Sequence, residues 1–140
     1  VCNSAASMID WIFSGKFEKF QNLKLLYAES QIGWITYFIE RADDTWRTHQ
    51  WAQGEKRIPK PPSHYYKKHV YSCFFKDTVG IDLLDRIGED NVLFETDYPH
   101  QDGTFPNTLA IAEELFGHLE QETIDKIARN NAIKLLGLTI

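Results

Sequence analysis

The chain is poor in cysteine and has no long apolar run. Its two cysteines, Cys2 and Cys73, lack both the spacing of a metal-binding pair and the density of a secreted disulfide scaffold. No apolar segment approaches the roughly 20 residues of a membrane-spanning helix, and no basic segment leads into an apolar one as in a signal peptide. We therefore expect a protein of the reducing cytoplasm that does not enter membranes.

A surplus of positive charge is also missing, because the formal net charge is -5. Nucleic-acid binding draws on clustered Lys and Arg, so no nucleic-acid partner is expected. Hydrophobic residues make up 43% of the sequence and charged residues 25%, which is typical of a folded globular protein. The composition therefore excludes a disordered or fibrous chain.

The sequence lacks an initial methionine and the length of a large enzyme fold. It begins with Val1, and its single methionine is Met8. Its 140 residues allow one hydrophobic core, whereas a complete (β/α) barrel takes roughly 250 residues. We expect either that a leading piece has been removed or that the segment is the tail of a longer protein.

Three short apolar runs alternate with helical patterns. Residues 23–28, 70–75 and 92–95 have the length and composition of buried strands. Apolar residues at intervals of three and four predict helices over residues 4–15, 33–51, 63–68, 77–87, 107–117, 121–129 and 130–136. The alternation predicts an α/β fold with parallel strands and right-handed crossovers. Three strands make an incomplete sheet unless another segment or chain supplies the rest.

Two of these helices carry further signals. Ser4 and Asp77 are N-cap residue types, so we expect them to begin the helices over residues 4–15 and 77–87. The helix over residues 33–51 has an aromatic stripe at helical spacing, which favours packing in the core over a ligand-binding face. Three prolines interrupt regular structure over residues 54–63 and predict a connecting segment there.

Side chains with chemical potential follow the strands. In parallel α/β folds, functional groups gather at the carboxyl ends of the strands. Glu29 follows the first strand, residues 75–77 follow the second and residues 95–100 follow the third. Asp97 is the most informative, because an ionised carboxylate in a water-poor position has to be paired, hydrogen-bonded or bound to a metal. Taken alone, it serves equally well as the cap of a following turn.

Two blocks of sequence carry recognisable motifs. The first block contains GKFEKFQNLK (15–24), AES (28–30), GW (33–34), YF (37–38) and ERAD (40–43). The second contains GEDN (88–91), FETDYPH (94–100) and NNAIKLLGL (130–138). Together they resemble the amidohydrolase-related family, which includes aminocarboxymuconate-semialdehyde-decarboxylase-like enzymes. The resemblance keeps the family's order and spans nearly the whole chain.

The resemblance implies a metal-dependent (β/α)8 barrel. Residues 1–140 would form its C-terminal part, with the three strands as the sixth, seventh and eighth. A divalent metal would lie at the mouth, and Asp97 would be both a metal ligand and a catalytic group close to the metal-bound water. Zn is the expected ion and Mn the alternative. Such an ion lowers the pKa of its bound water to about 7 and polarises a substrate carbonyl.

The chain departs from the family pattern at several positions. The family's His-x-His pair and a later histidine ligand would lie before Val1. Glu29 stands where the family's decarboxylases carry a histidine, so Glu29 is a second candidate catalytic residue and decarboxylation is in doubt. His100 and Trp34 are candidate substrate-binding residues at the same mouth. Their alternatives are a loop histidine bonded to the backbone and a tryptophan packed in the core.

Three functions are compatible with these observations. The first is a hydrolase in which metal-activated water attacks a small carbonyl-type substrate, and the second is a non-oxidative decarboxylase of a small carboxylate. The third is a non-catalytic half-barrel that forms a homo-oligomer to cover its open sheet edge. In each case the isolated chain is expected to be incomplete and inactive, because catalytic metals generally take three or more protein ligands.

Overall fold

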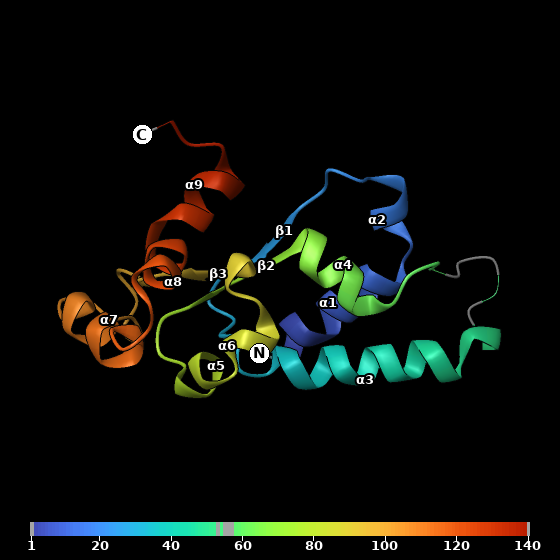
Figure 1. Cartoon of the computed structure of the whole chain (residues 1–140), viewed down its shortest axis with the longest axis horizontal. Helices are drawn as coiled ribbons and strands as arrows, with labels where there is room; N and C mark the ends of the chain where they lie inside the picture. Colours follow the sequence, from blue (N-terminus) through green and yellow to red (C-terminus); the bar gives the residue numbers. More distant parts are fainter. Residues whose placement is uncertain (1, 53, 55–57, 140) are drawn as a thin grey trace.

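Three parallel strands form the centre of the structure, with helices gathered at both ends of it (Figure 1). The computed structural model describes residues 2–52, 54 and 58–139. β1 (Leu25–Tyr27), β2 (Val70–Phe74) and β3 (Val92–Phe94) lie side by side in that order, so β2 is the middle strand. All pairs are parallel, and both the α/β class and the parallel sheet predicted from the sequence are confirmed.

The helices fill the connections between the strands and the segment after β3. In chain order they are α1 (Cys2–Phe13), α2 (Lys16–Lys19), α3 (Ile35–Thr48), α4 (Pro62–His69), α5 (Thr78–Asp82), α6 (Leu84–Ile87), α7 (Thr108–Phe116), α8 (Gln121–Asp125) and α9 (Asn131–Leu136). Short 3-10 turns cover Gln50–Ala52 and Glu89–Asn91, and a π-helical turn over Lys126–Asn130 joins α8 to α9. None of the described helices combines the length and apolar character needed to pass through a membrane.

The middle strand is buried along its whole length and on both faces. Val70 and Phe74 pack in the larger apolar cluster, which includes residues of α1, α4 and α7. Tyr71 and Cys73 pack with Leu93 of β3 in a smaller cluster that α9 covers. Successive side chains of a strand point to opposite faces, so odd and even positions of β2 belong to different clusters. The same alternation places Val92 of β3 in the larger cluster and Leu93 in the smaller one.

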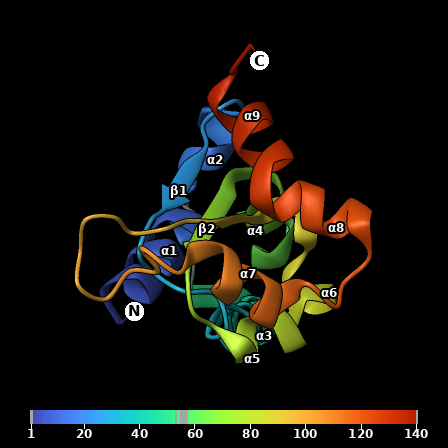
Figure 2. The ribbon, with the colours of Figure 1, turned by 90° about the vertical axis from the view of Figure 1, so that its left-hand side faces the viewer.

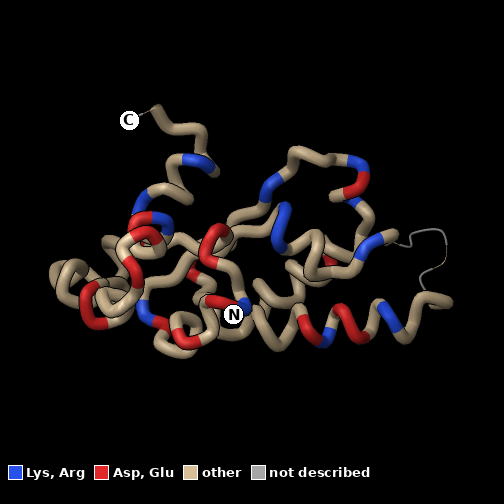
Figure 3. The backbone as a smooth tube through the Cα atoms, in the orientation of Figure 1, with Lys and Arg blue, Asp and Glu red and all other residues tan. Residues whose placement is uncertain are grey.

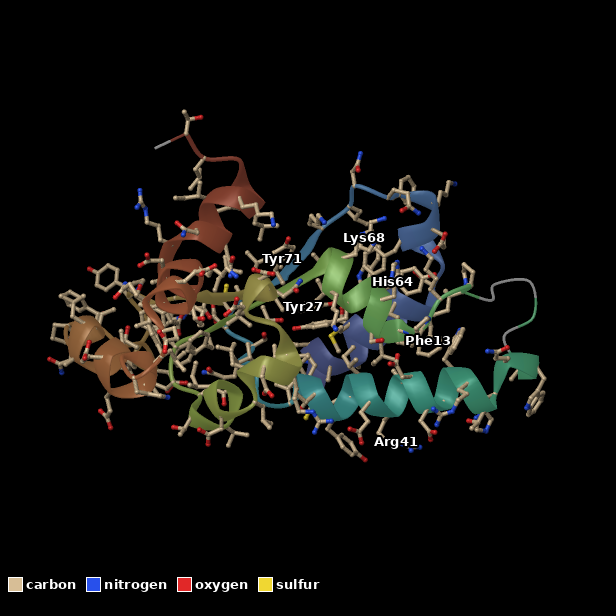
Figure 4. The ribbon with its side chains drawn as sticks, in the orientation of Figure 1. Phe13, Tyr27, Arg41, His64, Lys68 and Tyr71 are labelled. Atoms are coloured by element: carbon tan, nitrogen blue, oxygen red, sulfur yellow. The ribbon has the colours of Figure 1, made fainter. Side chains whose placement is uncertain are left out.

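The first strand is shorter and more exposed than the sequence predicts. It covers three residues instead of residues 23–28, and Leu26 is 41% exposed. The reason is its place in the sheet, since β1 lies at an edge of the three described strands. Its last residue is held from one side by α1, where the Tyr27 hydroxyl lies 3.0 Å from the Ser7 hydroxyl (Figure 4).

Two predictions about helix ends are wrong, and one region lies partly outside the described residues. α1 already begins at Cys2, so Ser4 lies inside the helix and does not cap it. The helix expected over residues 33–51 is shorter at both ends. α3 begins at Ile35 and ends at Thr48, and a separate 3-10 turn follows. The connecting segment expected over residues 54–63 includes residues 55–57, which are outside the described part of the chain.

α3 packs only part of the predicted aromatic stripe in the core, since Trp34 and Trp46 contact the larger apolar cluster. Its buried residues are Ile35 and Ala42, whereas Tyr37 of the aromatic stripe is 64% exposed. Acidic and basic residues are interleaved along the helix (Figure 3), and Asp44 pairs with both Arg41 and Arg47. Small and aliphatic residues together with Trp46 therefore hold α3 against the rest of the fold, and the part of the aromatic stripe around Tyr37 faces solvent.

After each strand, a buried polar side chain binds the backbone near the beginning of that same strand. His69, just before β2, lies with Nδ1 2.8 Å from a carbonyl oxygen in the segment leading into β1. Asn91 donates from its amide to the carbonyl of the first residue of β2 at 2.7 Å. Asn131 donates in the same way to the first residue of β3 at 2.7 Å and to Glu89 at 2.7 Å. Each tie satisfies a carbonyl group at or shortly before the start of a strand.

We expect replacement of Asn131 by alanine to lower the free energy of unfolding by about 2 kcal/mol, because it leaves buried carbonyl groups unsatisfied. Urea unfolding followed by circular dichroism measures the change. The neighbouring Asn130 is exposed and provides a matched control. Asn130→Ala should change the free energy by less than about 0.5 kcal/mol. Equal effects of the two substitutions would show that the side-chain ties do not stabilise the sheet.

Candidate metal centre

Side chains from two strand ends meet at one edge of the sheet. Glu29 follows the carboxyl end of β1, Asp97 follows that of β3, and His100 lies in the loop after Asp97. One ligand atom from each residue lies within 4.8 Å of the other two. The His100 Nδ1 is 2.8 Å from a carboxylate oxygen of Asp97 and 3.8 Å from one of Glu29. The structure therefore brings together three of the four site residues proposed from the sequence.

The three side chains differ in their exposure to solvent. The Asp97 side chain is 8% exposed, whereas those of Glu29 and His100 are 56% and 61% exposed. A nearly buried carboxylate therefore lies beneath two groups that solvent and small molecules can reach. Carboxylate oxygen and imidazole nitrogen are both ligands of Zn and Mn, so this donor set fits a divalent cation.

The backbone is unusual at both carboxylates of this group. Glu29 and Asp97 have φ angles of 53°, and Gln31 has a φ angle of 57°. Residues with a Cβ rarely adopt this left-handed conformation, which costs of order 1 kcal/mol or more each and persists only where surrounding contacts hold it. Sharp turns of this kind bring the carboxylates that follow β1 and β3 toward each other.

The loop over residues 96–104 carries Asp97 and His100 and stands away from the sheet (Figure 2). Its base is closed by a hydrogen bond from the Thr104 backbone N–H to the Thr96 carbonyl at 2.9 Å. The Lys76 ammonium, after β2, donates to the Gly103 carbonyl at 3.0 Å. The close approach explains the glycine, because a Cβ at Gly103 would lie 2.6 Å from the Thr96 carbonyl oxygen.

Glu95 lies beside this group, although the sequence alone did not single it out as a site residue. Its carboxylate accepts a hydrogen bond from the Glu29 backbone N–H at 2.7 Å. Burial raises the pKa of the Glu95 carboxyl, the bond from Glu29 opposes this, and the negative charge of Asp97 raises it further. Burial and the proximity of Glu95 raise the pKa of the Cys73 thiol to about 12. Strand alternation was the available signal, because it places residue 95 on the same face as residue 93.

Asp77, directly after β2, holds the segment that follows β1. Its carboxylate accepts backbone N–H groups from Ile32 at 2.6 Å and Gly33 at 2.7 Å, and from Gly80 at 2.8 Å. The predicted cap of the helix after β2 is therefore confirmed, although that helix is divided into α5 and α6. The packing is close, since a Cβ at Gly80 would lie 2.3 Å from the Ile32 side chain.

Trp34 lies outside the group of Glu29, Asp97 and His100. Its indole N–H donates to the carbonyl groups of Ser30 at 2.8 Å and Gln31 at 3.0 Å. The half-buried ring packs against the larger apolar cluster. Trp34 therefore supports the turn after β1 from the side of the core, and a contact with substrate stays a prediction.

A comparison with family models places the chain among known proteins. The amidohydrolase model matches residues 3–138. The chain belongs to the amidohydrolase family. This relationship agrees with the resemblance found in the sequence motifs.

Solved structures of similar fold include both an amidohydrolase and decarboxylases. An amidohydrolase from Mycobacterium avium subsp. paratuberculosis K-10 is 26% identical, with a TM-score of 0.80 over 97% of this chain and 33% of its own. The 5-carboxyvanillate decarboxylase from Sphingomonas paucimobilis is 18% identical, with a TM-score of 0.78 over 94% of this chain and 38% of its own. A dihydroxybenzoic acid decarboxylase from Polaromonas sp. JS666, with bound manganese and 2-nitroresorcinol, is 22% identical, with a TM-score of 0.72 over 96% and 40%.

This amidohydrolase chain spans between 33% and 40% of the length of those structures. Its parallel strands and helices therefore form part of a (β/α) barrel, as the sequence resemblance implied. Glu29, Asp97 and His100 lie at the carboxyl ends of these strands or in the loop that follows β3.

We expect Asp77→Ala to lower the free energy of unfolding of this amidohydrolase segment by about 2–3 kcal/mol, because it removes a helix cap and two further acceptor contacts. Chemical denaturation measures the loss. Asp82 is exposed at the end of the same helix, so Asp82→Ala is the matched control. A loss that is no larger for Asp77→Ala than for this control would contradict the assigned role.

Proposed function

We propose that an amidohydrolase containing this segment binds a divalent metal through Asp97 and releases CO2 from a small carboxylate substrate. The observation that carries the proposal is the meeting of Glu29, Asp97 and His100 at the carboxyl ends of the strands. The similar solved structures include several decarboxylases, and three of these structures hold manganese. These relatives favour decarboxylation over the hydrolysis that we expected first from the sequence.

Asp97 is the proposed principal ligand, and Glu29 is the proposed second ligand within this chain. Mn is the first candidate because manganese is bound in similar structures, and Zn is the second. When bound, the metal would supply Lewis-acid polarisation of a substrate oxygen. The nearly buried position of Asp97 suits a permanent ligand, whereas the exposed groups are open to exchange with solvent or substrate.

Glu29 is also the proposed proton donor, in its protonated form and released from the metal. In decarboxylation the bond between carbon and the carboxylate breaks, CO2 leaves, and the electron pair left on carbon takes up a proton. Glu29 occupies the position of the histidine in the family's decarboxylases, and its exposed side chain can approach a substrate more readily than Asp97 can. His100 is proposed to orient Asp97, at 2.8 Å, and to contact the substrate.

Hydrolysis is the second candidate reaction. It is supported by the 26% identity with an amidohydrolase and by the carboxylate at position 29 in place of histidine. As a general base, Glu29 would accept a proton from a water molecule that attacks a carbonyl carbon. The two reactions differ in their products, because CO2 is released only by decarboxylation.

Self-association is the third candidate function. Among the described strands, β1 and β3 each have one edge without a paired strand, and such edges are prone to join other chains. A homo-oligomer of this segment would cover them. Sedimentation velocity of the 140-residue chain tests this alternative by its dependence on protein concentration.

We expect the 140-residue chain to bind Mn2+ and Asp97→Ala to weaken that binding by at least about tenfold, because a ligand is lost. Electron paramagnetic resonance of free Mn2+ measures the affinity, and calorimetry with Zn2+ measures the preference between ions. Asp102→Ala removes an exposed carboxylate from the same loop and should leave the affinity unchanged. Equal affinity of Asp97→Ala and the parent chain would rule out this site.

We expect the isolated 140-residue chain to show no metal-dependent turnover, since it spans only part of its structural relatives. Release of CO2 from 5-carboxyvanillate and from 2,6-dihydroxybenzoate, with Mn2+ present, is the measurement. Turnover by the isolated chain that disappears in Asp97→Ala would contradict this expectation. For an intact protein carrying the segment, CO2 release supports decarboxylation, and hydrolysis products without CO2 would replace it by the second candidate.

A further inference from the structure

Glu95 connects the ends of all three strands through its backbone and its side chain. Its backbone N–H donates to the Phe74 carbonyl at 2.9 Å and so extends the pairing between β2 and β3 by one bond. Its carboxylate accepts the Glu29 backbone N–H at 2.7 Å and also contacts the Cys73 thiol of β2. One side chain therefore fixes the end of β1 relative to the end of β3.

The length of this side chain matters, because β1 and β3 are not neighbours. β2 lies between them, and adjacent strands are about 4.8 Å apart, so the contact crosses two strand spacings of roughly 10 Å in total. A glutamate at the end of β3 and the turn after β1 together bridge this distance. An aspartate is one methylene shorter and cannot hold the same bond without a movement of the backbone.

The bond acts on a backbone position that needs support. Glu29 has the left-handed φ angle of 53°, and its N–H is the group that Glu95 holds. Gln31, the other left-handed residue of this turn, is anchored separately, because its side-chain oxygen accepts the Phe75 backbone N–H at 3.3 Å. Glu95 is thus the tie from β3 to the one residue of this turn whose carboxylate lies with Asp97 and His100.

We propose that Glu95 is a positioning residue that holds Glu29 in the metal site by accepting its backbone N–H across β2. The inference rests on the proposed metal site and adds a residue that acts through Glu29 and does not itself touch the ion. The role depends on the position of the acceptor oxygen and on the length of the side chain, and it does not depend on the negative charge of Glu95. Two substitutions separate these properties.

Glu95→Gln keeps the length and an acceptor oxygen but removes the charge, whereas Glu95→Asp keeps the charge and shortens the side chain. Mn2+ titration of the 140-residue chain by electron paramagnetic resonance should give an affinity within about twofold of the parent for Glu95→Gln. The affinity should fall about tenfold for Glu95→Asp, as is usual when a group that orients a metal ligand is lost. Glu114→Asp, at an exposed position of α7, is the control and should have no effect.

A second measurement does not depend on metal. Hydrogen exchange of the Glu29 backbone amide, followed by ¹⁵N NMR on the metal-free chain, should be at least about tenfold faster in Glu95→Asp than in the parent. Glu95→Gln should retain the protection, and thermal unfolding verifies that all variants are folded. If the parent binds no Mn2+, the metal site is wrong and this exchange experiment alone decides the inference. Unchanged exchange in Glu95→Asp, or equal loss of affinity in Glu95→Asp and Glu95→Gln, would overturn it.

Discussion

The pairing of β2 with a parallel neighbour on each side is the constraint on which the rest of the structure depends. Parallel pairing directs all three carboxyl ends to the same edge, and complete burial of β2 keeps its neighbours in register. The turns after β1 and β3 therefore emerge two strand spacings apart, within reach of long side chains. Contacts across this interval come from Glu95 and from the meeting of Glu29 with Asp97 and His100.

The edge gathers negative charge, and this has an electrostatic cost. Glu29, Glu95 and Asp97 lie close to one another, and the side chain of Asp97 is largely shielded from solvent. Burial raises the pKa of the Glu95 carboxyl, and the negative charges of Asp97 and Glu29 raise it further, because like charges at short range destabilise the ionised forms. His100, next to both Asp97 and Glu29, offsets part of this repulsion when it is protonated. A divalent cation would offset more of it, which is the physical reason that this group of side chains suits a metal.

The amino ends and the carboxyl ends of the strands are held by different contacts. The amino ends of the strands are tied by buried amide and imidazole side chains to carbonyl groups, which stabilise the fold. The carboxyl ends are tied by Asp77 and Glu95 to backbone N–H groups, which leaves the turns with left-handed residues and exposed functional groups. This division agrees with the general pattern of (β/α) barrels, in which one face of the barrel stabilises it and the other carries the chemistry.

The alternation of apolar runs with helical patterns was sufficient to predict three parallel strands, and the motifs in two blocks of the sequence were sufficient to predict the family. Because parallel strands end at a common edge, the sequence also identified Glu29, Asp97 and His100 as residues to examine together. The separation of Glu29 from Asp97 and the bond from Glu29 to Glu95 were decided by tertiary structure, since each joins residues more than 60 positions apart in the chain. The exposed Tyr37 and the short β1 were decided in the same way. Local periodicity reports which residues share a face, but only packing determines which of those faces is covered and how far apart two strand ends lie.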